Sequence, residues 1–197
     1  MTCILVLGVP RSGTSAVAHV CRLLGVPMGE HLTPETPMNP AGGACQDEEF
    51  EQIVEQPQTM PARLPAYRAK RSQAGQDWGL KSHRLHRALP FLVPELDSVN
   101  IIRTHRPLER CRRSWIAGLE RNWRALRTDA PPAFEASLID EADAALAVYD
   151  SHLETLQVDF DRLLDAPAAA VGEIAAFLGR PCVSEAVFHI NAKLRKF

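Results

Sequence analysis

"ILVLGVPRSGTSAVAHV", residues 4–20, is the stretch that decides the fold of this chain. Its continuous apolar, β-branched start predicts a buried strand over residues 3–9. A glycine-containing loop follows, and the apolar spacing after it predicts a helix from Ser12 to Leu24, stopped by Gly25. A strand, a glycine loop and a helix in this order open a parallel α/β unit of the P-loop nucleotide-binding type.

The loop departs from the phosphate-binding pattern GxxxxGK[ST] at one position, because Thr14 stands where lysine is expected. Thr14 cannot neutralise a phosphate, but Arg11 brings a cation into the loop three residues earlier. The sequence therefore predicts a cradle for one phosphate, with a cation that reaches a group attached to it. Its donors are expected to be the backbone N–H groups from Arg11 to Ser15, Gly13 included, and the hydroxyls of Ser12, Thr14 and Ser15.

Further along the chain, short apolar segments alternate with helical patterns. Strands are predicted over residues 78–82, 98–105 and 157–160. Helices are predicted from Pro107 to about Leu126, over 140–156 and over 166–179. This alternation predicts a three-layer α/β/α fold, with a central parallel sheet and helices on both faces.

The segment between Pro27 and Pro65 differs from its surroundings, because it carries seven prolines. One helix-like island, "DEEFEQIVEQ", interrupts it. Such a density of proline favours a cap over the sheet, spanning about residues 27–77. The whole chain, residues 1–197, is expected to form one domain.

Composition narrows the class of protein. The chain has 197 residues, 46% of them hydrophobic, and a net charge of −2, which argues against a general nucleic-acid or membrane-surface binder. Between Arg103 and Arg127, however, eight arginines face only two acidic residues, which predicts a local cationic region or a solvated basic helix face. Five scattered cysteines without a CxxC pair, and a first segment without a basic leader, predict a cytoplasmic protein with reduced thiols. The histidines show no metal-binding spacing, so no metal is expected.

The loop residues "VPRSGTS" resemble the 5′-phosphosulfate loop of sulfotransferases that use 3′-phosphoadenosine 5′-phosphosulfate (PAPS). In that family the loop lysine or arginine contacts the 5′-phosphate and the bridging oxygen, and the resemblance gives this role to Arg11. The family also has a strand followed by an arginine and, eight residues later, a helical serine that together grip the 3′-phosphate. "RTHRPLERCRRSW" offers Arg106 and Ser114 at this spacing, with Arg103 as a competing arginine at the wrong spacing.

A third segment, "WGLKSHRL", resembles the family's K[T/S]H stretch. The resemblance makes His83 the base that takes a proton from the acceptor and Lys81 the cation that steadies the transferring sulfuryl group. Many bacterial relatives carry a rival base, the glutamate of "NPxGxxEDxxF". The nearest match here, "NPAGGACQDEEF", places Gln46 at that position, which leaves His83, Asp47 or Glu48 as alternatives.

The late segment "LQVDFDRLLDAPAAAVGEIAAFLG" resembles the family's last strand and helix. The RKG-type loop with which cytosolic animal enzymes clasp the 3′-phosphate has no counterpart. Only Lys193, Arg195 and Lys196 of "NAKLRKF" offer cations in its place.

The resemblance implies that the chain transfers a sulfuryl group from PAPS to a hydroxyl or amine and releases 3′-phosphoadenosine 5′-phosphate (PAP). Arg11 and Lys81 would stabilise the charge on the leaving group. The acceptor is expected to be a small molecule or a carbohydrate, in a pocket lined by the cap and residues 117–140, with Trp115, Trp123 and Phe134. Two alternatives stay open: a small-molecule kinase, which would need the missing lysine and a magnesium carboxylate, and a sulfotransferase-like protein that binds PAP or another anion without turnover. The sequence contains no signal for the oligomeric state.

Overall fold

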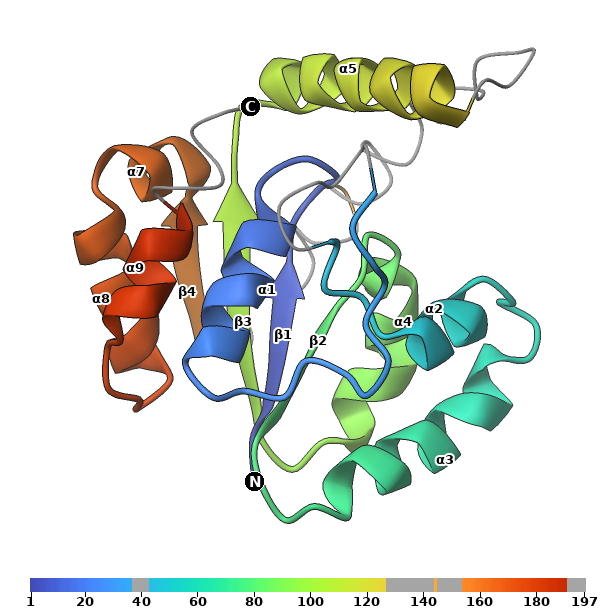
Figure 1. Cartoon of the computed structure of the whole chain (residues 1–197). Helices are drawn as coiled ribbons and strands as arrows, with labels where there is room; N and C mark the ends of the chain where they lie inside the picture. Colours follow the sequence, from blue (N-terminus) through green and yellow to red (C-terminus); the bar gives the residue numbers. More distant parts are fainter. Residues whose placement is uncertain (37–42, 127–143, 145–153, 191–197) are drawn as a thin grey trace.

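The structure is a computed structural model of the chain and describes residues 1–36, 43–126, 144 and 154–190. Within these residues a parallel sheet has the strand order β2-β1-β3-β4 (Figure 1). The strands are β1 (Cys3–Leu7), β2 (Trp78–Lys81), β3 (Val99–His105) and β4 (Glu154–Asp159). Val6 lies opposite both Lys81 and Ile102, so the carboxyl ends of β2, β1 and β3 meet at one edge of the sheet.

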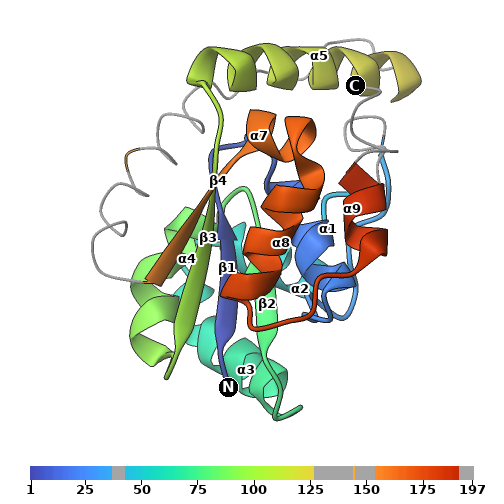
Figure 2. The ribbon, with the colours of Figure 1, turned by 90° about the vertical axis from the view of Figure 1, so that its left-hand side faces the viewer.

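Helices cover both faces of the sheet, as Figure 2 shows with the sheet seen from its side. One face carries α1 (Thr14–Leu23), α8 (Pro167–Phe177) and α9 (Ser184–His189), and the other carries α2 (Glu48–Val54), α3 (Met60–Ser72) and α4 (Leu85–Leu92) with the short 3-10 helix η1 (Val93–Glu95). Each face of the sheet has its own hydrophobic core, and alternate residues of β1 belong to one or the other. Ile4 and Val6 pack towards α1, while Leu5 and Leu7 pack towards α2–α4. The predicted three-layer α/β/α fold with a parallel sheet is confirmed.

The helix α5 (Leu108–Leu126) belongs to neither layer. It follows β3 and crosses above the carboxyl ends of the strands, and α7 (Phe160–Asp165) follows β4 at the same edge (Figure 1). An ion pair between Arg110 and Asp161 joins these two helices. The loop between β1 and α1 therefore lies beneath a helix rich in arginine.

The predicted helix over residues 140–156 is wrong at its end, because residues 154–156 belong to β4. Most of the remaining residues of that prediction lie outside the described part of the chain. β4 pairs only with β3 among the described strands and is largely half-buried or exposed. Such a strand lacks the continuous apolar run that marks a central strand. The predicted helix was therefore extended over its first residues. Phe160, predicted as the last strand residue, instead begins α7.

None of the helices within the described ranges is both long enough and apolar enough to span a bilayer.

Candidate active site

The loop between β1 and α1 has the backbone form of an anion cradle. Arg11 and Gly13 have positive φ angles, 72° and 103°, and the Ser12 N–H donates to the Val9 carbonyl at 3.1 Å. The N–H groups at the start of α1, from Thr14 to Ala16, find no backbone acceptor within the described residues. These donors and the positive end of the helix dipole are thus available to a bound anion.

Ser12 ties the loop to the sheet. Its hydroxyl is fully buried and lies 2.6 Å from the Thr104 hydroxyl, which in turn lies 3.2 Å from the Leu7 carbonyl. Both the N–H and the hydroxyl of Ser12 are thereby engaged within the protein. Ser12 shapes the loop, whereas Thr14 and Ser15 lie on the first turn of α1 beside its unbonded N–H groups.

Gly13 leaves room for an aromatic ring from α7. A Cβ atom at Gly13 would lie 2.2 Å from Cδ2 of Phe160. The Arg106 guanidinium is stacked over the same ring, with its Cζ atom 4.9 Å from the ring centroid. Phe160 thus fixes both the loop and Arg106. It was not among the predicted site residues, and only its place at the end of a predicted strand could have indicated it.

The structure brings Arg106 and Ser114 together around Arg11. The Arg11 Nε donates to the Ser114 hydroxyl at 3.2 Å, and the Arg106 Nη1 donates to the Arg11 carbonyl at 3.3 Å. The Nε of Arg106 is buried and has no hydrogen-bond acceptor among the described residues. The competing Arg103 lies within β3, half-buried. The arginine and serine eight residues apart therefore meet at the loop, with one guanidinium donor left for a ligand.

Lys81 lies at the carboxyl end of β2, beside the loop. Its side chain is buried, and desolvation lowers the pKa of Lys81 to about 8, although the nearby Glu51 carboxylate opposes this change. The charge of Arg11 lowers this pKa further, which shows that the two cations are neighbours. A buried ammonium next to an arginine is an arrangement suited to a strongly anionic ligand.

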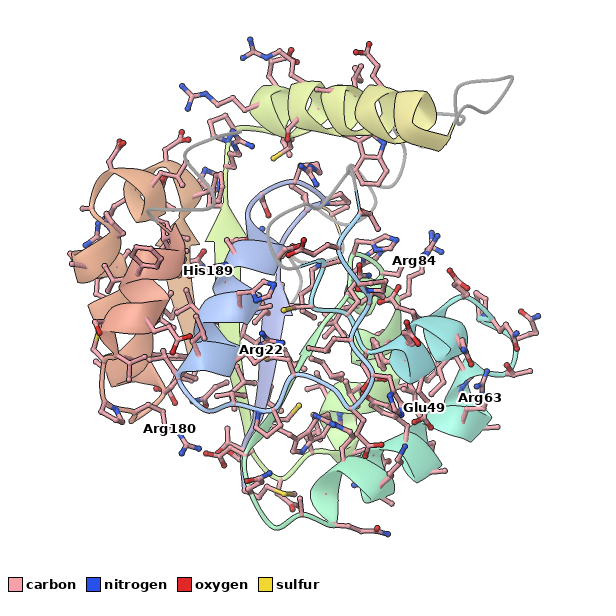
Figure 3. The ribbon with its side chains drawn as sticks, viewed as in Figure 1. Arg22, Glu49, Arg63, Arg84, Arg180 and His189 are labelled. Atoms are coloured by element: carbon pink, nitrogen blue, oxygen red, sulfur yellow. The ribbon has the colours of Figure 1, made fainter. Side chains whose placement is uncertain are left out.

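His83 follows Lys81 and meets two residues from the other side of the site. The Gln46 Nε2 lies 2.9 Å from the Nδ1 of His83, and the nearest carboxylate oxygen of Glu51 lies 4.0 Å from the same atom. Burial, helped by Lys81 and Arg84, lowers the pKa of His83 to about 3. Arg84, labelled in Figure 3, bridges from the turn before α4 to Glu55 of α2 at 3.1 Å.

Glu51 is an ionisable residue of this site that the sequence interpretation missed. Burial raises the pKa of its carboxyl group, while hydrogen bonds from Ser82 and Gln46 and the charge of Lys81 act against that rise. Its position four residues after Asp47, on the same face of a predicted helix, was the available signal. The carboxylate lies between Lys81, His83 and Arg84, and it lowers the net positive charge of the site.

Asp47, one of the alternative bases, caps α2. One carboxylate oxygen accepts from the N–H groups of Glu49 and Phe50 at 3.0 and 3.2 Å, and the other accepts from the Glu30 N–H at 2.9 Å. Asp47 is buried, so its lone pairs are directed into the protein, whereas Glu48 is exposed on the first turn of the helix.

Several sequence predictions lie outside the described part of the chain: the Trp123 side chain, Phe134, Lys193, Arg195 and Lys196. Trp115 is described, and its buried indole N–H has no acceptor among the described residues. Within the same ranges there is no cluster of three histidine, cysteine or acidic side chains that could hold a metal ion.

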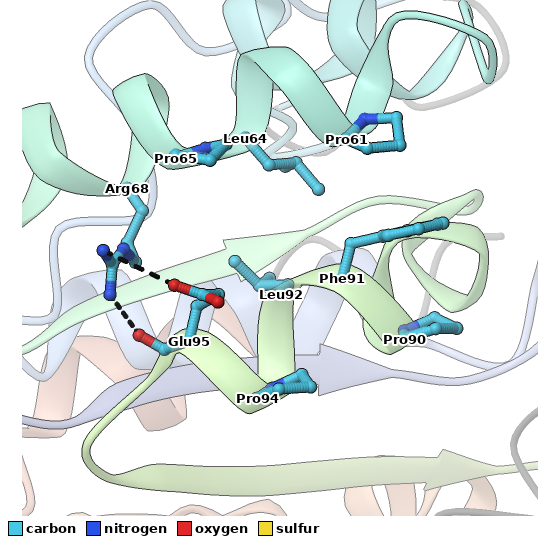
Figure 4. Close-up of a pocket in the computed structure, with 9 residues that line it drawn as sticks. All are labelled: Pro61, Leu64, Pro65, Arg68, Pro90, Phe91, Leu92, Pro94 and Glu95. Carbon is cyan, nitrogen blue, oxygen red and sulfur yellow. Dashed lines mark hydrogen bonds and ion pairs between the residues drawn. The ribbon is translucent and has the colours of Figure 1, made fainter.

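A separate apolar hollow of about 300 Å³ lies between α3 and the end of α4 (Figure 4). Prolines and Phe91 line it, and Arg68 closes one end through an ion pair with Glu95. Figure 1 shows α3 near the opposite end of the strands from the glycine loop. This hollow contributes none of the residues described above.

Comparison with known proteins places the fold but not the family. No family model and no curated protein sequence matches the chain. Among solved structures, a sulfotransferase of Mycobacterium tuberculosis is 19% identical with a TM-score of 0.52, the two matched regions covering 95% of this chain and 70% of the other. The sulfotransferase domain of the Synechococcus PCC 7002 olefin synthase is also 19% identical, with a TM-score of 0.53 and coverages of 95% and 76%.

A sugar kinase from a Janibacter species is similar to the same degree, with 15% identity, a TM-score of 0.51 and coverages of 95% and 98%. At such low identities the similarity shows the fold alone. This chain has the α/β fold that these sulfotransferases and the sugar kinase share. The same fold also occurs in a kinase, so the reaction has to be argued from the residues of the site.

Proposed function

We propose that the chain is a sulfotransferase that transfers a sulfuryl group from PAPS to a hydroxyl or amine of an acceptor. The observation that carries this proposal is the arrangement of Arg11 between Arg106 and Ser114, directly beside the unbonded N–H groups of α1. It offers two anion sites next to each other. A nucleotide with phosphates on both its 5′ and 3′ sides needs such a pair.

A further observation supports PAPS as the ligand of these residues. The buried Nε of Arg106 lacks an acceptor in the described part of the chain, and an unbonded buried donor is costly unless a ligand completes it. A 3′-phosphate held by Arg106 and Ser114 would supply that acceptor. The first turn of α1, with Thr14 and Ser15, would hold the 5′-phosphate.

PAPS supplies an activated sulfuryl group, so the task of the protein is orientation and stabilisation of charge. Arg11 would contact the bridging oxygen, on which negative charge develops in a loose transition state. Lys81, buried beside Arg11, would act on the same charge without the screening of bulk water. His83, next to Lys81 and partly exposed, would contact the acceptor.

The first test is thermal unfolding with PAP, with ADP and magnesium, and without ligand. A ligand at about 100 times its dissociation constant stabilises the native state by about 2.7 kcal/mol, which raises the Tm of a domain of this size by about 5–10 °C. We expect this rise with PAP and not with ADP. Arg106→Gln should abolish it, because the 3′-phosphate loses its main cation.

Arg113→Gln is the matched control for that experiment. Arg113 lies on α5, which begins two residues after Arg106, is 70% exposed and forms an ion pair only with Glu109 among the described residues. This variant should keep the full response to PAP. A rise in Tm with PAP that survives Arg106→Gln would contradict the proposed nucleotide site.

The reaction itself needs a second measurement, the transfer of ³⁵S from labelled PAPS to a panel of phenols, sugars and amines. Binding of PAP without transfer to any acceptor would favour a protein that holds the nucleotide without turnover. The structural similarity to a sugar kinase makes phosphoryl transfer the other candidate. Stabilisation by ADP and magnesium, with none by PAP, would favour that reaction.

A further inference from the structure

Two side chains from the segment around α2, Gln46 and Glu51, lie next to the ring of His83. Gln46 precedes α2, Glu51 lies on α2 and His83 follows β2. The Gln46 Nε2 is 2.9 Å from the His83 Nδ1, whereas the Glu51 carboxylate is 4.0 Å from that atom, too far for a hydrogen bond. The imidazole therefore has one hydrogen-bonded partner on this side, the amide.

The orientation of the Gln46 amide follows from the carboxylate beside it. The Gln46 amide also acts on Glu51, where it lowers the pKa of a carboxyl group whose Oε1 is buried without a hydrogen-bond partner among the described residues. A reversed amide would direct its carbonyl oxygen at the carboxylate, and two acceptors would then face each other in a buried position. The amide nitrogen can only donate, so the Nδ1 of His83 must accept.

We infer that Gln46, oriented by Glu51, is a positioning residue that holds His83 as a neutral imidazole with its proton on Nε2. The other charged and titratable groups that face the ring act in the same direction. Lys81 from β2, and Arg84, His86 and Arg87 from the start of α4, all disfavour a second proton on the ring. Among the described neighbours the opposing charge is that of Glu51 from α2, 4.0 Å from the Nδ1, and it is shared with Lys81 and Arg84.

This inference deepens the proposed function and rests on it for its consequence in catalysis. With its proton on Nε2, His83 presents a hydrogen-bond donor to the site and cannot accept a proton there. It would donate to an oxygen of the transferring sulfuryl group or of the acceptor. The base expected at His83 from the sequence would thus become an electrophilic group.

The test is the protonation state of His83 in ¹⁵N-labelled protein, read by long-range ¹H–¹⁵N correlation of the imidazole rings. His83→Gln assigns the signals. In the wild-type protein we expect a protonated Nε2, an unprotonated Nδ1 and no change between pH 8 and pH 5. A protonated Nδ1, a mixture of tautomers or a titration in this range overturns the inference.

Gln46→Met removes the amide donor while it keeps the length of the side chain. We expect the Nδ1–H tautomer to appear in this variant, directed at Glu51, and the proton affinity of the ring to increase by about tenfold or more. Gln52→Met, at an exposed position of α2, is the control and should keep the wild-type spectrum. An unchanged His83 in Gln46→Met would overturn the role of Gln46.

If Gln46→Met does not fold, the wild-type spectrum alone decides the tautomer. The measurement uses neither PAP nor an acceptor. A protein that fails to bind PAP but shows this tautomer would contradict the proposed function and leave the inference about Gln46 intact.

Discussion

Arg11 combines a strained backbone with hydrogen bonds to Arg106 and Ser114. A φ of 72° is uncommon for a residue other than glycine and costs about 1–2 kcal/mol. The carbonyl of Arg11 accepts from Arg106, and its side chain donates to Ser114, so β3 and α5 both hold it in place. This backbone conformation places the Arg11 guanidinium against Ser114 of α5, where the second anion site is proposed.

Gly13 allows a prediction that separates backbone strain from steric overlap. Gly13 and Gly25 both have positive φ angles, 103° and 85°, but a Cβ at Gly25 would have nothing within 4 Å. Gly25→Ala should therefore cost only the backbone strain, about 1–2 kcal/mol. Gly13→Ala should cost about 1–3 kcal/mol more, because the new methyl group would displace Phe160.

Unfolding in urea measures both costs. Gly13→Ala should also weaken the binding of PAP, since Phe160 supports Arg106. Equal losses of stability in the two variants would show that the contact with Phe160 carries no energy.

Among the elements, those with strong local signals were predicted, whereas two helices with an internal proline were not. β1, β3, α1, α5 and α8 all appear close to their predicted bounds. α3 and α4 were missed because Pro65 and Pro90 lie inside them, and proline normally ends a helix. Both prolines are exposed in the structure.

The site shows the same division between local and tertiary information. The loop, the pair Arg106 and Ser114, and the segment with Lys81 and His83 could be located from motifs, because each follows a predicted strand. Glu51 and Phe160 could not, since their positions at the site depend on how α2 and α7 pack. The hydrogen bond from Gln46 to His83 joins residues 37 positions apart, and no local pattern encodes it.

The helix α2 carries a prediction about its cap. Asp47 is buried and accepts three backbone hydrogen bonds, whereas Asp159, the cap of α7, is exposed and accepts one, from the Arg162 N–H at 2.9 Å. Asp47→Ala should destabilise the protein by about 2–4 kcal/mol, since it leaves buried N–H groups without partners. Asp159→Ala should cost about 0.5–1 kcal/mol.

Chemical denaturation compares the two capping variants. Because Gln46 and Glu51 flank Asp47, Asp47→Ala should also disturb the imidazole signals of His83, and Asp159→Ala should not. Similar losses of stability in the two variants would contradict the structural role assigned to Asp47.

At the scale of the whole molecule, the candidate site lies where the two cores of the sheet meet. Arg11 and Ser12 follow β1, which contributes to both cores. Lys81 ends β2, and His83 follows it and lies near Gln46 and Glu51. α5 and α7 close the edge from above. The position of each ionisable group therefore depends on global folding, so its protonation is linked to stability.

His83 gives the sign of that linkage. Its pKa is lowered from 6.5 to about 3 in the folded protein, so the folded state favours the neutral ring. As the pH falls below 6.5, the unfolded chain takes up a proton on this ring that the folded protein does not, and stability decreases by up to about 1.4 kcal/mol per pH unit. The stabilisation is complete above pH 6.5 and is lost as the pH falls towards 3.

We therefore expect His83→Gln to flatten the dependence of stability on pH. Between pH 7 and pH 5 the wild-type protein should lose about 1–2 kcal/mol more than the variant, whatever the variant costs at neutral pH. Urea unfolding at several pH values measures the slopes, and His31→Gln, at an exposed histidine, serves as the matched control. Equal slopes in the wild-type protein and His83→Gln would mean that His83 accepts a proton in the folded state as readily as in the unfolded chain. The half-buried ring bonded to the Gln46 amide could not then be its resting form.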